Sequence, residues 1–172
     1  MRQPYLEDVD LRLYQGDALE VLREMPSGSV HMACTSPPFW SLRDYQTEGQ
    51  IGLEETIDEW VERLCDVFDE VKRVLRDDGT FWCELGDSYS SGNRQGHGTR
   101  IGVKQGTNRA SAAGHDNNRP PTPEGLKPKD LIGQPWRLAF ALQQRGWFLR
   151  SEIIWARRPT QSDAGVRDRQ AD

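Results

Sequence analysis

Two consecutive prolines, Pro37 and Pro38, directly follow a short apolar run and constrain the fold of this chain more than any other feature. Residues 29–34 are mostly apolar and follow a Pro-Ser-Gly turn, a pattern that predicts a buried strand. The prolines fix their own φ angles, remove two backbone donors and hold Ser36 extended. In an open α/β sheet, ligands bind beyond the carboxyl ends of the strands, which is where this rigid turn would lie.

The turn presents groups that suit a flat substrate with an exocyclic amine. Ser36 offers a hydroxyl, Pro37 a carbonyl and Phe39 an aromatic face. The amine would donate to the Ser36 hydroxyl oxygen and to a carbonyl next to a proline, while the substrate ring stacks on Phe39. We therefore expect Ser36, Pro37, Pro38 and Phe39 to form a catalytic site. For a bare Ser-Pro-Pro sequence, the alternative is a stiff loop or helix entry without chemistry.

Residues 36–39 resemble the catalytic Ser-Pro-Pro-aromatic signature of DNA methyltransferases that methylate amino groups. The resemblance is to the cytosine-N4 branch, since the adenine-N6 branch usually has Asp at the position of Ser36. It continues in order through residues 16–22, 76–80, 85–89, 127–133, 135–137 and 151–155. It implies a site-specific enzyme of the restriction-modification or phage type that transfers a methyl group from S-adenosylmethionine to the N4 amine of cytosine in DNA. Adenine-N6 methylation is one alternative, and a catalytically inactive remnant that binds DNA or a protein partner is another.

Strand patterns alternate with helix patterns along the chain, which predicts an α/β fold with about four mostly parallel strands and flanking helices. We expect strands at residues 11–14, 29–34, 80–85 and 147–155, and helices at 18–25, 57–75 and 130–145. The second helix has the clearest apolar stripe and starts with a capping box. We expect Gly79 to end it in a left-handed conformation. By resemblance, these strands form part of a larger Rossmann-like methyltransferase sheet.

Polar residues after two of these strands have open interpretations. Asp17 begins a helix with Glu20 three residues later, as in a capping box. The resemblance also implies that Asp17 binds the cofactor, accepting a hydrogen bond from the adenine amine of S-adenosylmethionine. Residues 86–89 should lie beside the Ser-Pro-Pro turn if the sheet is parallel. Asp87 would then line the pocket or belong to a plain turn.

The charge distribution bears on DNA binding. The net charge of −5 argues mildly against it, because DNA-binding proteins commonly have a basic patch. Residues 91–129 instead carry a net positive charge, and their Gly, Asn, Ser and Pro content predicts a long mobile basic loop. We expect contacts with double-stranded DNA, whose target base must be flipped out of the stack to reach the turn. The expected DNA-binding residues are Arg43, Arg94, Arg100, Lys104 and Arg109.

The length of 172 residues predicts one domain, with residues 1–155 as the catalytic part and 156–172 as a polar tail. The enzymes that this sequence resembles hold the cofactor with an aromatic-x-Gly-x-Gly loop, and we find no such loop here. We therefore expect the N-terminal catalytic half of a methyltransferase, with little activity by itself. Open sheet edges invite association, so we also expect self-association or a complementary polypeptide as a partner.

The remaining features predict no further site. Cys34, Cys65 and Cys83 are widely spaced within apolar patterns, which predicts reduced core residues rather than disulfides or a zinc site. The histidines have no ligand-like spacing either, so we expect no metal. No apolar run approaches the roughly 20 residues of a membrane span, and the N-terminus has no apolar signal core. We expect a cytoplasmic protein with no membrane partner.

Overall fold

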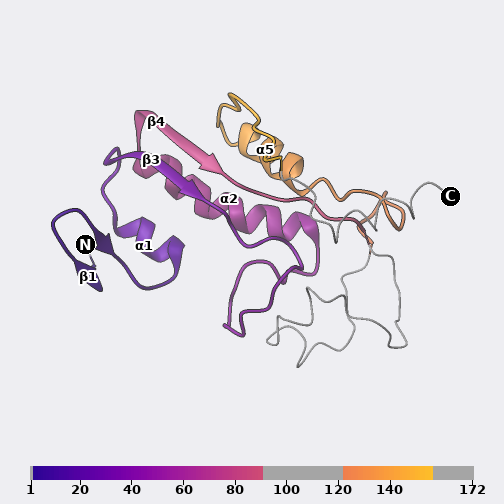
Figure 1. The fold of residues 1–172 in the computed structure, drawn as a ribbon, viewed down its shortest axis with the longest axis horizontal. Helices are drawn as coiled ribbons and strands as arrows, with labels where there is room; N and C mark the ends of the chain where they lie inside the picture. The colour runs from indigo at the N-terminus through magenta and orange to yellow at the C-terminus, as the bar shows by residue number, and fades with distance from the viewer. Residues whose placement is uncertain (1, 91–121, 157–172) are drawn as a thin grey trace.

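The computed structural model describes residues 2–90 and 122–156. Its elements are β1 (Leu6–Glu7), β2 (Arg12–Leu13), α1 (Ala18–Glu24), β3 (Val30–Thr35), α2 (Ile57–Val74), β4 (Leu75–Cys83) and α5 (Gln134–Gln144). Strands β3 and β4 form a parallel pair beside α2, whereas β1 and β2 form a separate antiparallel hairpin (Figure 1). The α/β class is confirmed. The described residues contain four strands as predicted, but the prediction that they are mostly parallel is wrong, because they form two separate pairs and only β3–β4 is parallel.

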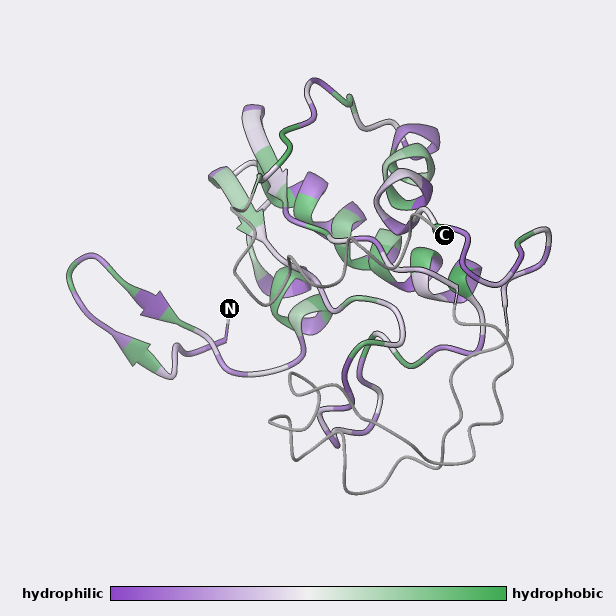
Figure 2. Ribbon diagram, turned by 45° about the vertical axis from the view of Figure 1, so that its right-hand side comes forward, coloured by the Kyte–Doolittle hydropathy of each residue, from purple (hydrophilic) through white to green (hydrophobic). Residues whose placement is uncertain are grey.

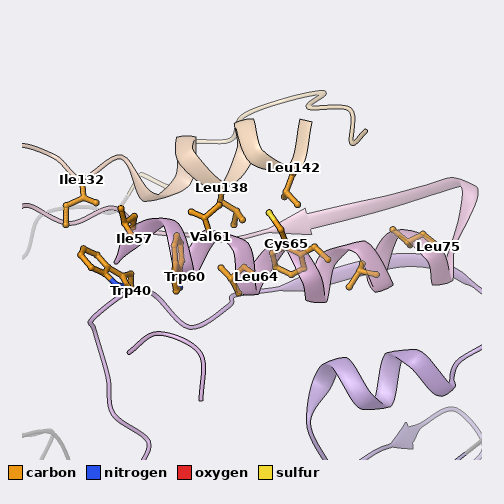
Figure 3. Close-up of a cluster of buried hydrophobic side chains, with 12 residues drawn as sticks. Trp40, Ile57, Trp60, Val61, Leu64, Cys65, Leu75, Ile132, Leu138 and Leu142 are labelled. Carbon is orange, nitrogen blue, oxygen red and sulfur yellow. The ribbon is translucent and has the colours of Figure 1, made fainter. Parts of the chain in front are cut away.

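Helix α2 organises the core. Its N-terminus has the predicted capping box, in which Glu59 N donates to Thr56 Oγ1 at 3.2 Å and Thr56 N donates to Glu59 Oε2 at 3.1 Å. The predicted apolar stripe is buried, namely Ile57, Trp60, Val61, Leu64, Phe68, Val71 and Leu75, and Cys65 and Val74 are buried with it. Figure 3 shows Leu138 and Leu142 of α5 pointing toward this stripe. The stripe is therefore a packing surface between two helices.

The end of α2 differs from the prediction. The helix ends at Val74, and Leu75 is already extended as the first residue of β4. Gly79 lies inside β4 and does not adopt a left-handed conformation. A Cβ atom at position 79 would lie 2.9 Å from the Arg76 carbonyl oxygen and 3.2 Å from that of His31. Glycine is needed here because the backbones approach closely, not because a helix ends.

The two faces of the β3–β4 sheet have different surroundings. Ala33 and Phe81 are register partners, and both pack against the core on the side of α2. Successive side chains of a strand point to opposite faces, so Met32 and Trp82 lie on the other face. They are 58% and 48% exposed. The strand predicted at residues 29–34 is confirmed, but the prediction that it is buried is wrong.

Two predicted strands do not join this sheet. Within residues 11–14 only Arg12–Leu13 is a strand, and it pairs with β1 in a hairpin that projects from the helices (Figure 2). Residues 147–155 adopt no regular structure. Their exposed apolar side chains are Phe148, Leu149, Ile153, Ile154 and Trp155. A strand needs hydrogen-bonding neighbours, and no described segment pairs with these residues.

Helix α5 is shorter than the predicted 130–145 but ends as expected, with Gly146 at a φ of +83°. Only one of the three cysteines belongs to the core, since Cys65 is buried whereas Cys34 and Cys83 are exposed. Burial raises the pKa of the Cys65 thiol to about 11.

Parts of the predicted loop and tail lie outside the described residues, namely 91–121 and 157–172. Among the helices that the structure describes, none has the length and apolar content to cross a membrane. Within residues 2–90 and 122–156, no three His, Cys, Asp or Glu side chains are grouped so that they could hold a metal ion.

Candidate active site

The Ser-Pro-Pro turn follows the carboxyl end of β3 and lines a pocket of about 190 Å³. The lining residues are Ser36, Pro37, Pro38, Phe39, Leu42, Arg43 and Tyr45. The structure therefore brings the four predicted catalytic residues together with Arg43, one of the predicted DNA-binding residues. The other four, Arg94, Arg100, Lys104 and Arg109, lie outside the described residues.

Buried side chains hold this turn in place from two helices. The indole Nε1 of Trp60, on α2, donates to the Pro38 carbonyl oxygen at 2.9 Å. The backbone N–H of Trp40 donates to Gln134 Oε1 at 3.1 Å, and Gln134 is the first residue of α5. Trp60 is fully buried, and Gln134 is 1% exposed. The turn is thus fixed by hydrogen bonds in an environment where their loss would leave buried polar groups unsatisfied.

Ser36 has a carboxylate partner that sequence reasoning missed. Its Oγ donates to Glu84 Oε2 at 2.6 Å. The parallel register pairs Thr35 with Cys83, which brings the next residue of each strand side by side. A serine hydroxyl has one proton and two lone pairs, so donation to Glu84 leaves Ser36 Oγ able to accept. The available sequence signal was a charged residue, Glu84, near the carboxyl end of the strand expected at residues 80–85.

Phe39 packs against the chain that leaves β4. A Cβ atom at Gly86 would lie 2.9 Å from Phe39 Cε2, so only glycine leaves room for the ring in this position. Gly86, the first of residues 86–89, therefore lies beside the turn as predicted.

Asp87 neither lines the pocket nor forms a plain turn. Its carboxylate accepts from the backbone N–H groups of Gly133 at 3.0 Å and Gln134 at 3.1 Å, and so it caps the N-terminus of α5. A carboxylate is favourable there because it satisfies free donors and complements the helix dipole. Ser88 adds a second link to the same helix, with its Oγ accepting from Gln134 Nε2 at 2.8 Å.

The polar loop at residues 41–54 is tied to α2 by Arg63. The guanidinium donates to the carbonyl oxygens of Gly49 at 2.6 Å and Gln50 at 3.0 Å, and to Glu54 Oε1 at 2.8 Å. The Glu54 side chain is only 5% exposed. One cation therefore holds three points of the loop that carries part of the pocket wall.

Gln50 completes the connection between this loop and the pocket. Its Oε1 accepts from the backbone N–H of Tyr45 at 2.7 Å, and its Nε2 donates to the Arg43 carbonyl oxygen at 3.0 Å. Both partners line the pocket. The loop therefore shares one pocket with the Ser-Pro-Pro turn.

The position of Asp17 supports its structural interpretation. Its Oδ1 accepts from the backbone N–H of Glu20 at 3.1 Å and caps α1. It does not line the pocket, and its cofactor contact stays a prediction. S-Adenosylmethionine has a nucleoside and an amino-acid end, and one carboxylate at the start of α1 does not enclose both. Asp17 alone therefore does not make a site for S-adenosylmethionine.

A pocket beyond the carboxyl end of a parallel strand is typical of α/β proteins that bind ligands at this edge. Comparison with known families identifies the family within this class. Residues 30–170 match the DNA methylase family, whose members methylate amino groups of the N6 and N4 type. The chain belongs to this family. DNA methyltransferases of the family use S-adenosylmethionine as methyl donor.

Several curated relatives have similar sequences. The chain is 55% identical over 157 residues to the type II methyltransferase M.Cfr9I of Citrobacter freundii, covering 91% of this chain and 49% of that protein. It is 49% identical over 158 residues to the type II methyltransferase M.SmaI of Serratia marcescens, covering 92% of this chain and 51% of that protein. The chain thus spans about half the length of these relatives. Among solved structures it is similar to the PvuII DNA methyltransferase (cytosine-N4-specific), with a TM-score of 0.44 and 20% identity over 77% of this chain and 33% of that one.

Proposed function

We propose that this chain is the catalytic part of a site-specific DNA methyltransferase that methylates the N4 amine of cytosine. The observation that carries the proposal is the hydroxyl of Ser36, which donates to Glu84 and lines the same pocket as Phe39. Membership of the DNA methylase family supports methyl transfer to an amine. The type II methyltransferases among its relatives support a role in restriction-modification.

The cytosine amine needs activation because its lone pair is delocalised into the ring. Ser36 Oγ, with its proton directed to Glu84, accepts one hydrogen bond from the amine. The Pro37 carbonyl accepts the other, since no described group donates to it. Two fixed acceptors draw the amine toward tetrahedral geometry and localise its lone pair for attack. Catalysis rests on positioning and on electrostatic stabilisation.

The amine must also lose a proton when it is methylated. Glu84 Oε2 lies 2.6 Å from Ser36 Oγ, so the carboxylate can take the hydroxyl proton as Ser36 takes one from the amine. S-Adenosylmethionine, when bound, supplies the methyl group. The residues described here hold the amine, stack the flipped base on Phe39 and receive the proton.

The test is a hybrid enzyme in which residues 1–155 replace the matching half of M.Cfr9I. Modified DNA is digested to nucleosides, and mass spectrometry should find N4-methylcytosine. Ser36→Ala, Phe39→Ala and Glu84→Gln should each lower the rate by about a hundredfold or more. Glu48→Gln is the matched control, because Glu48 is exposed and outside the pocket. N6-methyladenine in the digest would establish the adenine alternative, and a hybrid that binds DNA without methylating it would favour the binding remnant.

The basic loop is part of the same proposal. We infer that residues 91–129 contact DNA phosphates without reading sequence, and that Arg43 contacts DNA at the pocket wall. Neutralising Arg94, Arg100, Lys104 and Arg109 together in the hybrid should weaken binding similarly for all sequences. It should also flatten the salt dependence, because fewer counterions are released. Unchanged affinity and slope would show that the loop is a spacer.

A further inference from the structure

A buried glutamine joins the segments that follow β3 and β4. Gln134 is 1% exposed, and its Oε1 accepts from the backbone N–H of Trp40 at 3.1 Å. Its Nε2 donates to Ser88 Oγ at 2.8 Å. A backbone N–H can only donate, so the bond from Trp40 fixes which end of the amide faces the turn. The carboxamide therefore ties the residue after Phe39 to the chain that leaves β4.

The backbone that carries this side chain is also fixed. The Gln134 N–H donates to Asp87 Oδ1 at 3.1 Å, in the cap of α5. Two residues earlier, the Ile132 N–H donates to the Ser88 carbonyl oxygen at 2.9 Å. Both acceptors belong to the segment after β4, so the start of α5 and this segment are joined as one unit. The Gln134 carboxamide extends from that unit to the turn.

The Phe39 ring reaches from one of the joined segments to the other. Phe39 directly precedes Trp40, whose N–H is held by Gln134. The ring packs against Gly86, where an added Cβ atom would lie 2.9 Å from Phe39 Cε2. Gly86 in turn lies two residues before Ser88. Without the carboxamide, the distance between the backbone that carries the ring and the segment against which it packs would no longer be fixed.

We propose that Gln134 is a positioning residue for methyl transfer, which sets the Phe39 ring for stacking on the target base. This proposal rests on the proposed function. Gln134 does not line the pocket, so it acts through Phe39 and not on the base. Pro38 has a link of its own, because Trp60 Nε1 donates to its carbonyl oxygen at 2.9 Å. Loss of Gln134 should therefore displace Phe39 while the first part of the turn stays in place.

A positioning role and a purely structural role predict different kinetics. Contacts with phosphates supply much of the affinity for DNA, whereas the rate of transfer depends on the geometry of the reacting atoms. A displaced ring should therefore lower kcat more than it changes KM for DNA. A purely structural glutamine would lower the stability of the chain and leave the rate of the folded enzyme unchanged.

Fluorine NMR of the whole chain tests the position of the ring directly. The chain has five phenylalanines, so para-fluorophenylalanine gives few signals, and Phe39→Leu assigns the one from Phe39. Gln134→Met keeps an unbranched side chain of similar length and removes the amide donor and acceptor. In this variant the Phe39 signal should shift or broaden. The Trp40 amide should also exchange its hydrogen about tenfold faster, while the amides within α2 keep their rates.

Two controls separate positioning from general loosening. Gln143→Met makes the same substitution at an exposed glutamine of α5. Leu142→Ala removes a buried side chain at the other end of α5 from Gln134 and lowers the stability of the chain. The Phe39 signal should stay in place in both controls. An unchanged Phe39 signal and Trp40 exchange rate in Gln134→Met would overturn the proposal, and so would equal changes in Leu142→Ala.

Kinetics of the hybrid enzyme test the consequence for methyl transfer. Gln134→Met should lower kcat about tenfold or more and change KM for DNA by less than about twofold. Ser88→Ala, which keeps the bond from Trp40 and removes the acceptor of Nε2, should have a smaller effect in the same direction. The double variant should be no slower than Gln134→Met, because both changes act on one link. An unchanged kcat in Gln134→Met, or effects that multiply in the double variant, would overturn the proposal.

Circular dichroism shows whether each variant has folded. If Gln134→Met does not fold, the shifted Phe39 signal and the lower kcat are required of Ser88→Ala alone, and their absence there would contradict the proposal.

The two kinds of readout separate this inference from the proposed function. Fluorine NMR and hydrogen exchange do not depend on methylation. A displaced Phe39 signal in Gln134→Met, together with a hybrid enzyme that does not methylate cytosine, supports Gln134 as the residue that sets the ring and contradicts the proposed function. A hybrid enzyme that methylates cytosine with the same kcat in the wild type and in Gln134→Met supports the function and contradicts the inference.

Discussion

The Ser-Pro-Pro turn and the segment 147–155 are both rich in aromatic residues, yet their surroundings differ. Trp40 and Trp60, at the turn, are 3% and 0% exposed, whereas Trp155 is 83% exposed. Each buried indole at the turn also donates to a carbonyl oxygen, Trp40 Nε1 to Glu54 at 3.0 Å and Trp60 Nε1 to Pro38 at 2.9 Å. The two indoles at the turn are buried where other elements supply both apolar contacts and acceptors for their N–H groups.

Trp147 lies at the boundary between these two situations. Its ring packs against Phe81 with centroids 5.1 Å apart, but its buried Nε1 has no acceptor in the described residues. Such a group costs about 1 to 3 kcal/mol. The indole N–H groups at the Ser-Pro-Pro turn therefore have acceptors, whereas that of Trp147, at the start of the segment after α5, has none among the described residues.

The largest expected effect is at Trp60. Trp60→Ala should lower the free energy of unfolding by about 3 to 5 kcal/mol, because it leaves a cavity beneath the Ser-Pro-Pro turn. Trp60→Phe keeps an aromatic ring but removes the donor to Pro38, and should cost about 1 to 2 kcal/mol. Urea unfolding followed by circular dichroism measures both. Equal losses in the two variants would show that the ring itself contributes little to the turn.

A second expected effect concerns pH and the buried thiol of the core. Burial raises the pKa of Cys65 from 9.0 to about 11, so the folded state holds this proton more tightly than the unfolded state does. The contribution is complete below about pH 9 and is lost as the pH rises toward 11. We expect the wild type to lose about 2 kcal/mol of stability over this interval beyond the loss in Cys65→Ala. Parallel urea titrations at each pH test it, and identical slopes would contradict the buried thiol's role.

Sequence reasoning succeeded where the determinants are local. The stripe of α2, its capping box at Thr56 and the rigid turn at Pro37 and Pro38 each depend on residues close in the chain. The resemblance supplied the family, and comparison with known proteins confirmed it. The combination predicted the rigid Ser-Pro-Pro turn and the α/β class, and the catalytic role of the turn stays a prediction.

The misses involve pairing between distant segments. Glu84 reaches Ser36 only because the register pairs Thr35 with Cys83. The predicted strand at residues 147–155 has a suitable pattern but no neighbour among the described residues. Met32 was expected to be buried because it lies in an apolar pattern. Such a pattern shows that a segment prefers a core, but not whether another layer covers that face of the sheet, and Met32 is exposed. Local sequence does not determine these partners.

A smaller effect is expected at Arg63, which links α2 to the loop at residues 41–54 that forms part of the pocket wall. Arg63→Ala should cost only about 1 kcal/mol, because the guanidinium is partly exposed. It should nevertheless speed hydrogen exchange of the amides in residues 41–54 by about tenfold, since three contacts to that loop are lost. Arg23→Ala is the matched control, because within the described residues Arg23 pairs only with the exposed Glu20. Faster exchange in the control as well would indicate general loosening.

The smallest expected effect is at Trp155. Trp155→Ser removes the same side-chain type as Trp60→Ala, but from a position that is 83% exposed and makes no described hydrogen bond. The free energy of unfolding should change by less than about 0.5 kcal/mol. Acrylamide quenching should fall in this variant because a solvent-exposed indole is lost, while the buried indoles at the turn stay protected. A loss above about 1 kcal/mol in the isolated chain would mean that Trp155 packs against the rest of the chain, and that its contrast with the indoles at the Ser-Pro-Pro turn is weaker than the exposed fractions indicate.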